Sequence, residues 1–89
     1  MKEINVTIQN EYGLHARPSS LLATLASNFK SDIKIIKDGI EVNCKSIMNL
    51  LLLAAGKGTV LKIVADGEDE EEALKAIREL IEVSKFDED

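Results

Sequence analysis

Alternation of apolar and polar residues predicts four short strands along this chain. In residues 2–8, three apolar side chains are each separated by one polar residue, which indicates a half-buried strand. Similar patterns predict three further strands, at residues 33–36, 40–42 and 60–65. Asp38 and Gly39 lie between the second and third strands and are typical of a tight hairpin turn, so these strands are expected to pair. Cys44 continues the alternation of the third strand, which favours burial, while a chemical role for its thiol stays open.

Helical spacing of apolar residues predicts three helices. The first follows a turn-like loop at residues 10–13 and places apolar residues at i, i+3, i+4 and i+7 from Leu22. Pro18 suits its first turn, because the missing N–H breaks no helical hydrogen bond there. Ser46 is a plausible N-cap for a short second helix over residues 47 to about 54. The last helix carries one apolar stripe, formed by Ala73, Leu74, Ile77, Leu80 and Ile81.

Acidic residues gather at the start of the last helix. Asp69 and Glu72 have the spacing of a capping box, in which each side chain bonds the other residue's backbone N–H. The acids of residues 68–72 lie at the positive end of the helix dipole. We interpret them as a solvated face that complements the dipole, rather than as a metal or basic-partner site. No metal and no cofactor is expected.

The predicted elements follow the order β-α-β-β-α-β-α, which indicates the α+β class. An open sheet covered on one face by three helices, a two-layer open-faced β-sandwich, is the natural solution for this order. A chain of 89 residues is enough for one domain with one core. We therefore expect a single domain over residues 1–89, with the tail at residues 86–89 frayed.

Charge and composition narrow the classes of partner. The net charge is −5, with 11 acids and 3 bases in residues 66–89. An acidic chain is a poor nonspecific ligand for nucleic acid. The chain has one tyrosine, two phenylalanines and no tryptophan, and they do not fall together on one strand, as stacking on RNA bases requires. No nucleic-acid partner is expected.

Cysteine usage and apolar runs predict the compartment. Cys44 is the only cysteine and cannot form an internal disulfide, so a reducing cytosol fits best. The longest apolar run, residues 50–55, is far shorter than the roughly 20 residues that span a bilayer. The first ten residues lack the apolar segment of a signal peptide. We expect a cytoplasmic protein without direct membrane insertion.

The candidate chemistry lies in residues 13–20, which read GLHARPSS. His15, the only histidine, precedes the first helix, where free backbone N–H groups form a ready anion site. A neutral imidazole is a good nucleophile near neutral pH, and the guanidinium of Arg17 can hold phosphate oxygens. The residues alone leave open whether His15 acts as a nucleophile or only caps the helix.

Two motifs resemble the signatures of a known family. Residues 13–18, GLHARP, resemble the active-site signature of the histidine-containing phosphocarrier protein (HPr) family of the bacterial phosphoenolpyruvate-dependent sugar phosphotransferase system. Residues 45–50, KSIMNL, resemble the second signature of this family, at the matching distance. The resemblance covers essentially the whole chain and implies a four-stranded antiparallel sheet with three helices on one face.

The resemblance implies a phosphoryl carrier. His15 would accept a phosphoryl group on Nδ1 from phosphorylated enzyme I and pass it to sugar-specific enzyme IIA domains in sugar uptake. Arg17 would stabilise the transferring group. The protein would then be a co-substrate rather than a turnover enzyme. Two alternatives stay open: a regulatory paralogue such as a nitrogen-branch carrier, and a protein-binding module without covalent chemistry.

The resemblance also implies regulatory and docking residues. Ser46 matches a position that a serine kinase phosphorylates in many Gram-positive relatives, so a kinase/phosphorylase is a candidate partner, although a plain N-cap is equally consistent. The short helix after it is apolar on nearly all sides, which predicts an exposed docking patch unless the whole helix packs in the core. We expect a monomer with Leu50 and Leu53 in the core. The residues expected to contact partners are Ile47, Met48, Leu51, Ser20 and Thr24.

Overall fold

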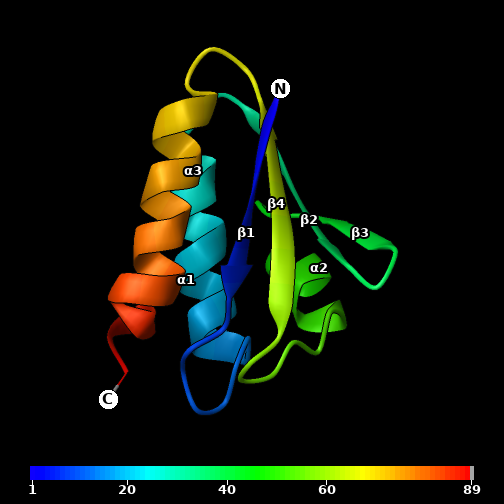
Figure 1. Ribbon diagram of the computed structural model, residues 1–89, viewed down its shortest axis with the longest axis vertical. Helices are drawn as coiled ribbons and strands as arrows, with labels where there is room; N and C mark the ends of the chain where they lie inside the picture. Colours follow the sequence, from blue (N-terminus) through cyan, green and yellow to red (C-terminus); the bar gives the residue numbers. More distant parts are fainter. Residues whose placement is uncertain (89) are drawn as a thin grey trace.

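The structure, a computed structural model, describes residues 1–88. Within that range four strands form one antiparallel sheet in the order β1-β4-β2-β3, which confirms the predicted architecture (Figure 1). The strands are β1 (Lys2–Thr7), β2 (Asp32–Lys37), β3 (Ile40–Asn43) and β4 (Val60–Asp66). Buried and exposed side chains alternate along β2 and β4, so one face of the sheet is covered and the other is open.

The turn between β2 and β3 is formed by Asp38 and Gly39, whose φ angles are 50° and 81°. Both values lie in the left-handed region, as a two-residue type I′ hairpin turn requires. Val42 and Cys44 are buried, as the alternation predicts. Ile40 is exposed, because it stands at the closing end of a hairpin that projects from the sheet (Figure 1).

In the described part of the chain, three α-helices pack on the covered face: α1 (Ala16–Ser27), α2 (Ile47–Leu52) and α3 (Glu70–Arg78) (Figure 1). A π-helical turn (Glu79–Val83) and a 3₁₀ turn (Lys85–Asp87) follow α3. The second helix ends earlier than predicted, because Ala54 adopts a φ of 48° and a left-handed residue cannot continue a right-handed helix.

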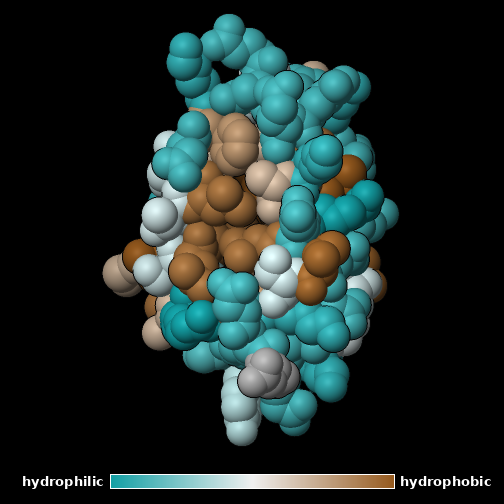
Figure 2. All heavy atoms as spheres, turned by 90° about the vertical axis from the view of Figure 1, so that its left-hand side faces the viewer, coloured by the Kyte–Doolittle hydropathy of each residue, from teal (hydrophilic) through white to brown (hydrophobic). Residues whose placement is uncertain are grey.

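The core lies between the sheet and the helices. Leu22 and Ala26 of α1, Leu50 of α2 and Leu53 directly after α2 are buried. Each fully buried leucine contributes roughly 1.5–3 kcal/mol relative to exposure. The predicted stripe of the last helix is buried apart from Leu80, which is half-buried. On the side of the molecule that carries α3, apolar atoms gather near the middle with hydrophilic side chains around them (Figure 2).

The predicted capping box at the start of α3 is wrong. Asp69 makes no capping bond, and its carboxylate accepts hydrogen bonds from the backbone N–H groups of Lys30 at 2.8 Å and Ser31 at 3.0 Å. The Ser31 hydroxyl also donates to it and is the main cause that lowers the pKa of Asp69. Glu70 instead accepts from the Gly67 N–H. The carboxylate of Asp69 therefore joins the loop before β2 to the start of α3, a long-range contact that local spacing cannot reveal.

The predicted fraying of the tail is wrong for residues 86–88, and Asp89 lies outside the described residues. Phe86 is fully buried, and Glu88 is hydrogen-bonded to side chains near the start of α1. Burial of a phenylalanine offsets the entropy lost when the last residues are ordered. Separately, no helix within residues 1–88 is long and apolar enough to cross a membrane.

Candidate functional site

His15 is the N-cap residue of α1, with extended backbone angles of φ −80° and ψ −171°, and its side chain makes no capping bond. The loop before it is held against the connection from α2 to β4, because the Leu14 N–H donates to the Ala55 carbonyl at 2.9 Å. Gly13 has a φ of 65°, and a Cβ there would lie 2.1 Å from the same carbonyl oxygen. Only glycine fits this approach, so Gly13 fixes where His15 stands.

The first turn of α1 leaves backbone donors free beside His15. Within residues 1–88, the N–H groups of Ala16 and Arg17 have no acceptor, and Pro18 has no N–H to satisfy. The helix then closes with the Ser19 N–H donating to the His15 carbonyl at 3.0 Å. Two unpaired donors at the positive end of a helix favour an anion next to His15.

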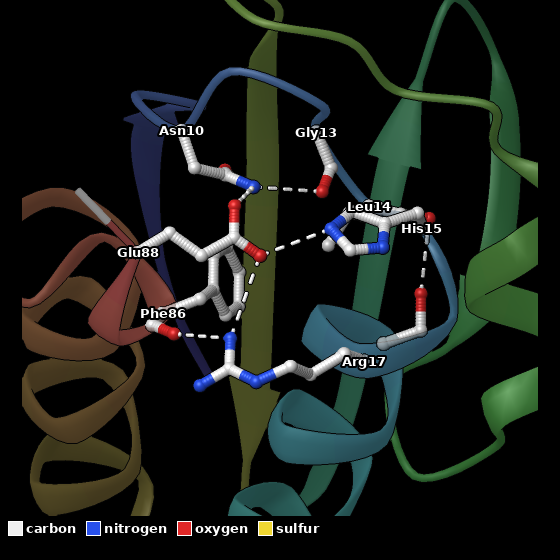
Figure 3. Close-up of polar contacts among 8 residues, drawn as sticks. Asn10, Gly13, Leu14, His15, Arg17, Phe86 and Glu88 are labelled. Carbon is white, nitrogen blue, oxygen red and sulfur yellow. Dashed lines mark hydrogen bonds and ion pairs between the residues drawn. The ribbon is translucent and has the colours of Figure 1, made fainter.

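The imidazole of His15 is held from one side only. Its Nε2 lies 2.9 Å from Oε2 of Glu88, while Nδ1 faces away from this carboxylate (Figure 3). Within residues 1–88, no hydrogen bond engages Nδ1. The ring of Tyr12 meets the imidazole edge-on, with centroids 6.2 Å apart and planes at 89°. An ionised carboxylate can only accept, so this contact favours the neutral imidazole that has its proton on Nε2 and a free lone pair on Nδ1.

The carboxylate of Glu88 contacts three side chains, which come from the loop before α1 and from the start of α1 itself. Its carboxylate accepts from the Asn10 amide at 3.1 Å and lies 3.4 Å from Nη1 of Arg17, in addition to the contact with His15 (Figure 3). The Asn10 amide, and after it His15, lowers the pKa of Glu88, so this carboxylate is ionised at neutral pH. Asn10 also donates to the Gly13 carbonyl at 2.8 Å and thereby links the loop to the tail.

The side chain of Arg17 lies next to the tail at residues 86–88. Its Nη1 donates to the Phe86 carbonyl at 2.7 Å, and about half of the side chain is exposed. The structure therefore brings the two residues predicted for the chemistry, His15 and Arg17, to one carboxylate. A guanidinium this exposed can exchange its carbonyl partner for oxygens of a bound anion.

The predicted docking helix has the expected orientation. Leu50 and Leu53 are buried, whereas Met48 is 76% exposed and Ile47 and Leu51 are also exposed. Leu52 is exposed too, which enlarges the apolar surface beyond the predicted set. Ser20 and Thr24 are exposed on α1, and α1 packs against α2. The partner contacts themselves stay a prediction.

Ser46 is the N-cap of α2, as predicted. Its Oγ accepts a hydrogen bond from the Asn49 N–H at 3.2 Å. The side chain of Asn49 in turn accepts from the Asn43 N–H, so the start of α2 is tied back to the end of β3.

Neither a reactive cysteine nor a metal-binding cluster is indicated within residues 1–88. Burial raises the pKa of the Cys44 thiol to about 12, so it is protonated and unreactive at neutral pH. Among the described residues, no group of three or more His, Cys, Asp or Glu side chains could hold a metal ion.

Local sequence patterns do not reveal the residues that surround the imidazole. They place Asn10 and Tyr12 only in a turn, and Phe86 and Glu88 in a frayed tail. A signal for the tail was present: Phe86 is a large aromatic residue within an otherwise polar and acidic end, which is unusual for a segment that stays in solvent. No pattern indicated that Glu88 would reach His15, because the contact joins residues 73 positions apart.

Comparison with known proteins identifies the family. The family model described as "PTS HPr component phosphorylation site" matches residues 2–83. The chain is 46% identical over 89 residues to the phosphocarrier protein HPr of Xylella fastidiosa, covering 100% of this chain and 99% of that protein. It is also 46% identical over 86 residues to the HPr of Mycoplasma genitalium, covering 96% of this chain and 98% of that protein.

Solved structures agree with this relationship. A crystal structure of HPr-C-His from Thermoanaerobacter tengcongensis has a TM-score of 0.95 and 50% identity, covering 100% of this chain and 99% of that chain. The Bacillus subtilis protein Crh, described as a swapped dimer, has a TM-score of 0.74 and 42% identity, covering 91% and 93%. This chain belongs to the HPr family, the phosphocarrier proteins of the phosphotransferase system.

Proposed function

We propose that this protein carries phosphoryl groups in sugar uptake, accepting them on Nδ1 of His15 from phosphorylated enzyme I and passing them to enzyme IIA domains. The observation that carries the proposal is the environment of Nδ1. The contact of Nε2 with a carboxylate favours a free lone pair on Nδ1, and the two residues that follow His15 have unpaired backbone donors at the start of α1. A nucleophile next to an anion site is the arrangement that phosphoryl acceptance needs.

Arg17 would stabilise the transferring phosphoryl group. Its guanidinium now donates to the Phe86 carbonyl, a neutral acceptor. Phosphoryl oxygens are stronger, charged acceptors that fit the guanidinium fork, so we expect Arg17 to turn from the carbonyl to the phosphoryl group during transfer. The protein would act as a co-substrate, since the partner enzymes supply the rest of each site.

The exposed face of α2 supports a docking role for Ile47, Met48 and Leu51. Apolar side chains concentrated on one short surface helix are typical of protein-binding surfaces. Ser20 and Thr24 on the adjoining helix would complete the surface. An enzyme that covers this surface also covers the neighbouring start of α1, where the phosphoryl group is exchanged.

Ser46 would serve as a regulatory phosphorylation site, with a serine kinase/phosphorylase as partner. A phosphoryl group on its Oγ would add a charge of about −1.5 to −2 next to the exposed side chains of Ile47 and Met48. We further propose that the chain acts in the cytoplasm as a single-domain monomer, although related structures include an HPr dimer from Thermoanaerobacter tengcongensis.

Incubation with enzyme I and labelled phosphoenolpyruvate tests the carrier function. We expect label that mild acid releases and base retains, as for a phosphohistidine, and that an added enzyme IIA domain takes up. His15→Ala should abolish the label. Label that persists in this variant would disprove the assignment, and absence of label in the unchanged protein would favour a binding module.

A further inference from the structure

The contact between Glu88 and His15 has the geometry of a hydrogen bond that selects which imidazole nitrogen carries the proton. Nε2 of His15 and Oε2 of Glu88 are 2.9 Å apart, and the side chain of Glu88 is only 19% exposed. A carboxylate that is largely withdrawn from water forms a stronger charge-assisted hydrogen bond than an exposed one.

We propose that Glu88 is a positioning residue for phosphoryl transfer: it holds His15 as the Nε2-protonated tautomer and balances the positive charge that forms on the ring when Nδ1 takes up a phosphoryl group. This inference rests on the proposed function and adds to it a residue from the other end of the chain.

The transfer step then needs no proton movement. The Nδ1 lone pair forms a bond to phosphorus, while the bond between phosphorus and the donor group of enzyme I breaks and leaves its electron pair with the donor. The ring becomes an imidazolium whose proton stays on Nε2, facing the carboxylate of Glu88. When the phosphoryl group passes on, the bonding pair returns to Nδ1 and the neutral Nε2-protonated ring is restored.

The structure holds Glu88 in place for this task. Phe86, two residues earlier, is fully buried and anchors the tail, although Lys85, Phe86 and Asp87 have φ angles of 52°, 57° and 59°. Three successive non-glycine residues in the left-handed region are unfavourable, so compensating contacts must maintain the turn. Burial of the Phe86 ring and the bond from Arg17 to its carbonyl are such contacts.

Asn10 fixes which carboxylate oxygen meets the imidazole. Its buried amide donates to Oε1 of Glu88 and also to the Gly13 carbonyl, so Oε2 is the oxygen presented to Nε2 (Figure 3). The same amide thus orients the carboxylate and the loop that ends at His15. A tail that merely rested on the surface would not share a buried donor with the histidine loop.

The test compares Glu88→Gln with Asp87→Asn, which removes the same charge one residue away. Asp87 is exposed and, among the described residues, its side chain forms no ion pair or hydrogen bond with His15. Asparagine also tolerates the left-handed backbone at this position. Both variants leave Phe86 in place, and the dispersion of amide resonances confirms that each one folds.

The first measurement is ¹⁵N NMR of the neutral imidazole, which reports how the proton is shared between Nδ1 and Nε2 and requires no phosphorylation. We expect essentially one tautomer, protonated on Nε2, in the unchanged protein and in Asp87→Asn. Glu88→Gln should show a mixture, because an amide can either accept or donate. The same ratio in all three proteins would overturn the proposal.

The second measurement is the rate of phosphoryl acceptance from enzyme I at saturating concentration. Losing a charge-assisted hydrogen bond to the ring should slow Glu88→Gln roughly tenfold, while Asp87→Asn should match the unchanged protein. Equal slowing of both variants would mean that the negative charge of the tail affects how enzyme I docks. That result would overturn the positioning role of Glu88. Failure of the proposed function is distinguishable, because the protein would then take no label while the tautomer result could still stand.

Discussion

The two helices that begin at His15 and Ser46 start in opposite ways. Ser46 caps α2 with its own side chain, which accepts the Asn49 N–H, so a donor at the start of the helix is already satisfied. His15 occupies the same position of α1 but makes no capping bond, and its imidazole turns instead to Glu88. An N-cap that does not cap gives up local stability and leaves backbone donors for a ligand.

The surroundings of the two helices also differ, because those of α1 are polar and those of α2 are apolar. The start of α1 is surrounded by polar groups from three segments: the loop at residues 10–15, the helix itself and the tail at residues 86–88 (Figure 3). The helix α2 is held by buried Leu50 and Leu53 and exposes apolar side chains on its other face. Adjoining helices therefore separate a polar site suited to chemistry from an apolar surface suited to docking.

The largest expected effect is loss of chemistry without loss of stability at the start of α1. His15→Ala should take no detectable phosphoryl label from enzyme I. The free energy of unfolding should fall by less than about 1 kcal/mol, because no capping bond is removed and the lost ion pair with Glu88 is partly exposed to solvent. Urea denaturation alongside the labelling assay measures both. A markedly less stable variant would show that His15 contributes to folding as Ser46 does.

The next largest effect is a difference between the buried and the exposed face of α2. Leu50→Ala should lower the free energy of unfolding by about 2–5 kcal/mol, because it leaves a cavity in the core. Met48→Ala should barely change stability, yet should weaken binding to enzyme I or an enzyme IIA domain by about 1 kcal/mol or more. Thermal denaturation and calorimetric titration distinguish the two. If Met48→Ala binds normally, the exposed face of α2 is not a docking surface.

Arg17→Lys sharpens the contrast at the polar site. Lysine keeps the charge but loses the planar fork, so phosphoryl transfer should slow by roughly tenfold. Stability should stay nearly constant, because a lysine ammonium can also donate to the Phe86 carbonyl and the Phe86 ring stays buried. Rapid-quench kinetics and a melting curve provide the two measurements. Normal transfer with a large loss of melting temperature would make Arg17 a structural residue.

These contrasts follow what local sequence patterns can and cannot reveal. Alternation and helical spacing are local, and they predicted the strands, the hairpin at Asp38-Gly39, the N-cap Ser46 and the rotation of α2. The position of His15 before α1 was predictable for the same reason, since Pro18 limits where a helix can begin.

The errors concern contacts between distant segments. Asp69 bonds the loop before β2 instead of its own helix, and Glu88 reaches a histidine near the other end of the chain. The hydrogen-bond partners of these two carboxylates leave no periodic pattern in the sequence. They depend on how the tertiary fold brings distant chain segments together. The early end of α2 at Leu52 is a separate, local error, because composition alone does not reveal that Ala54 takes a left-handed conformation.

The smallest expected effect tests whether the cap of α2 can also act as a switch. Ser46→Ala removes the bond to the Asn49 N–H and should cost about 1 kcal/mol of stability, with phosphoryl acceptance unchanged. Ser46→Asp should keep the cap, because aspartate accepts the same N–H, so its stability should stay close to that of the unchanged protein. It adds a negative charge beside Ile47 and Met48, which should slow acceptance from enzyme I at low salt and less so at high salt, where exposed charges are screened. Acceptance kinetics measured over a salt series compare the two variants, of which only Ser46→Asp carries added charge at the docking surface. Rates that stay the same for Ser46→Asp at every salt concentration would leave Ser46 a structural cap alone, and the two helix starts would then divide folding from chemistry completely.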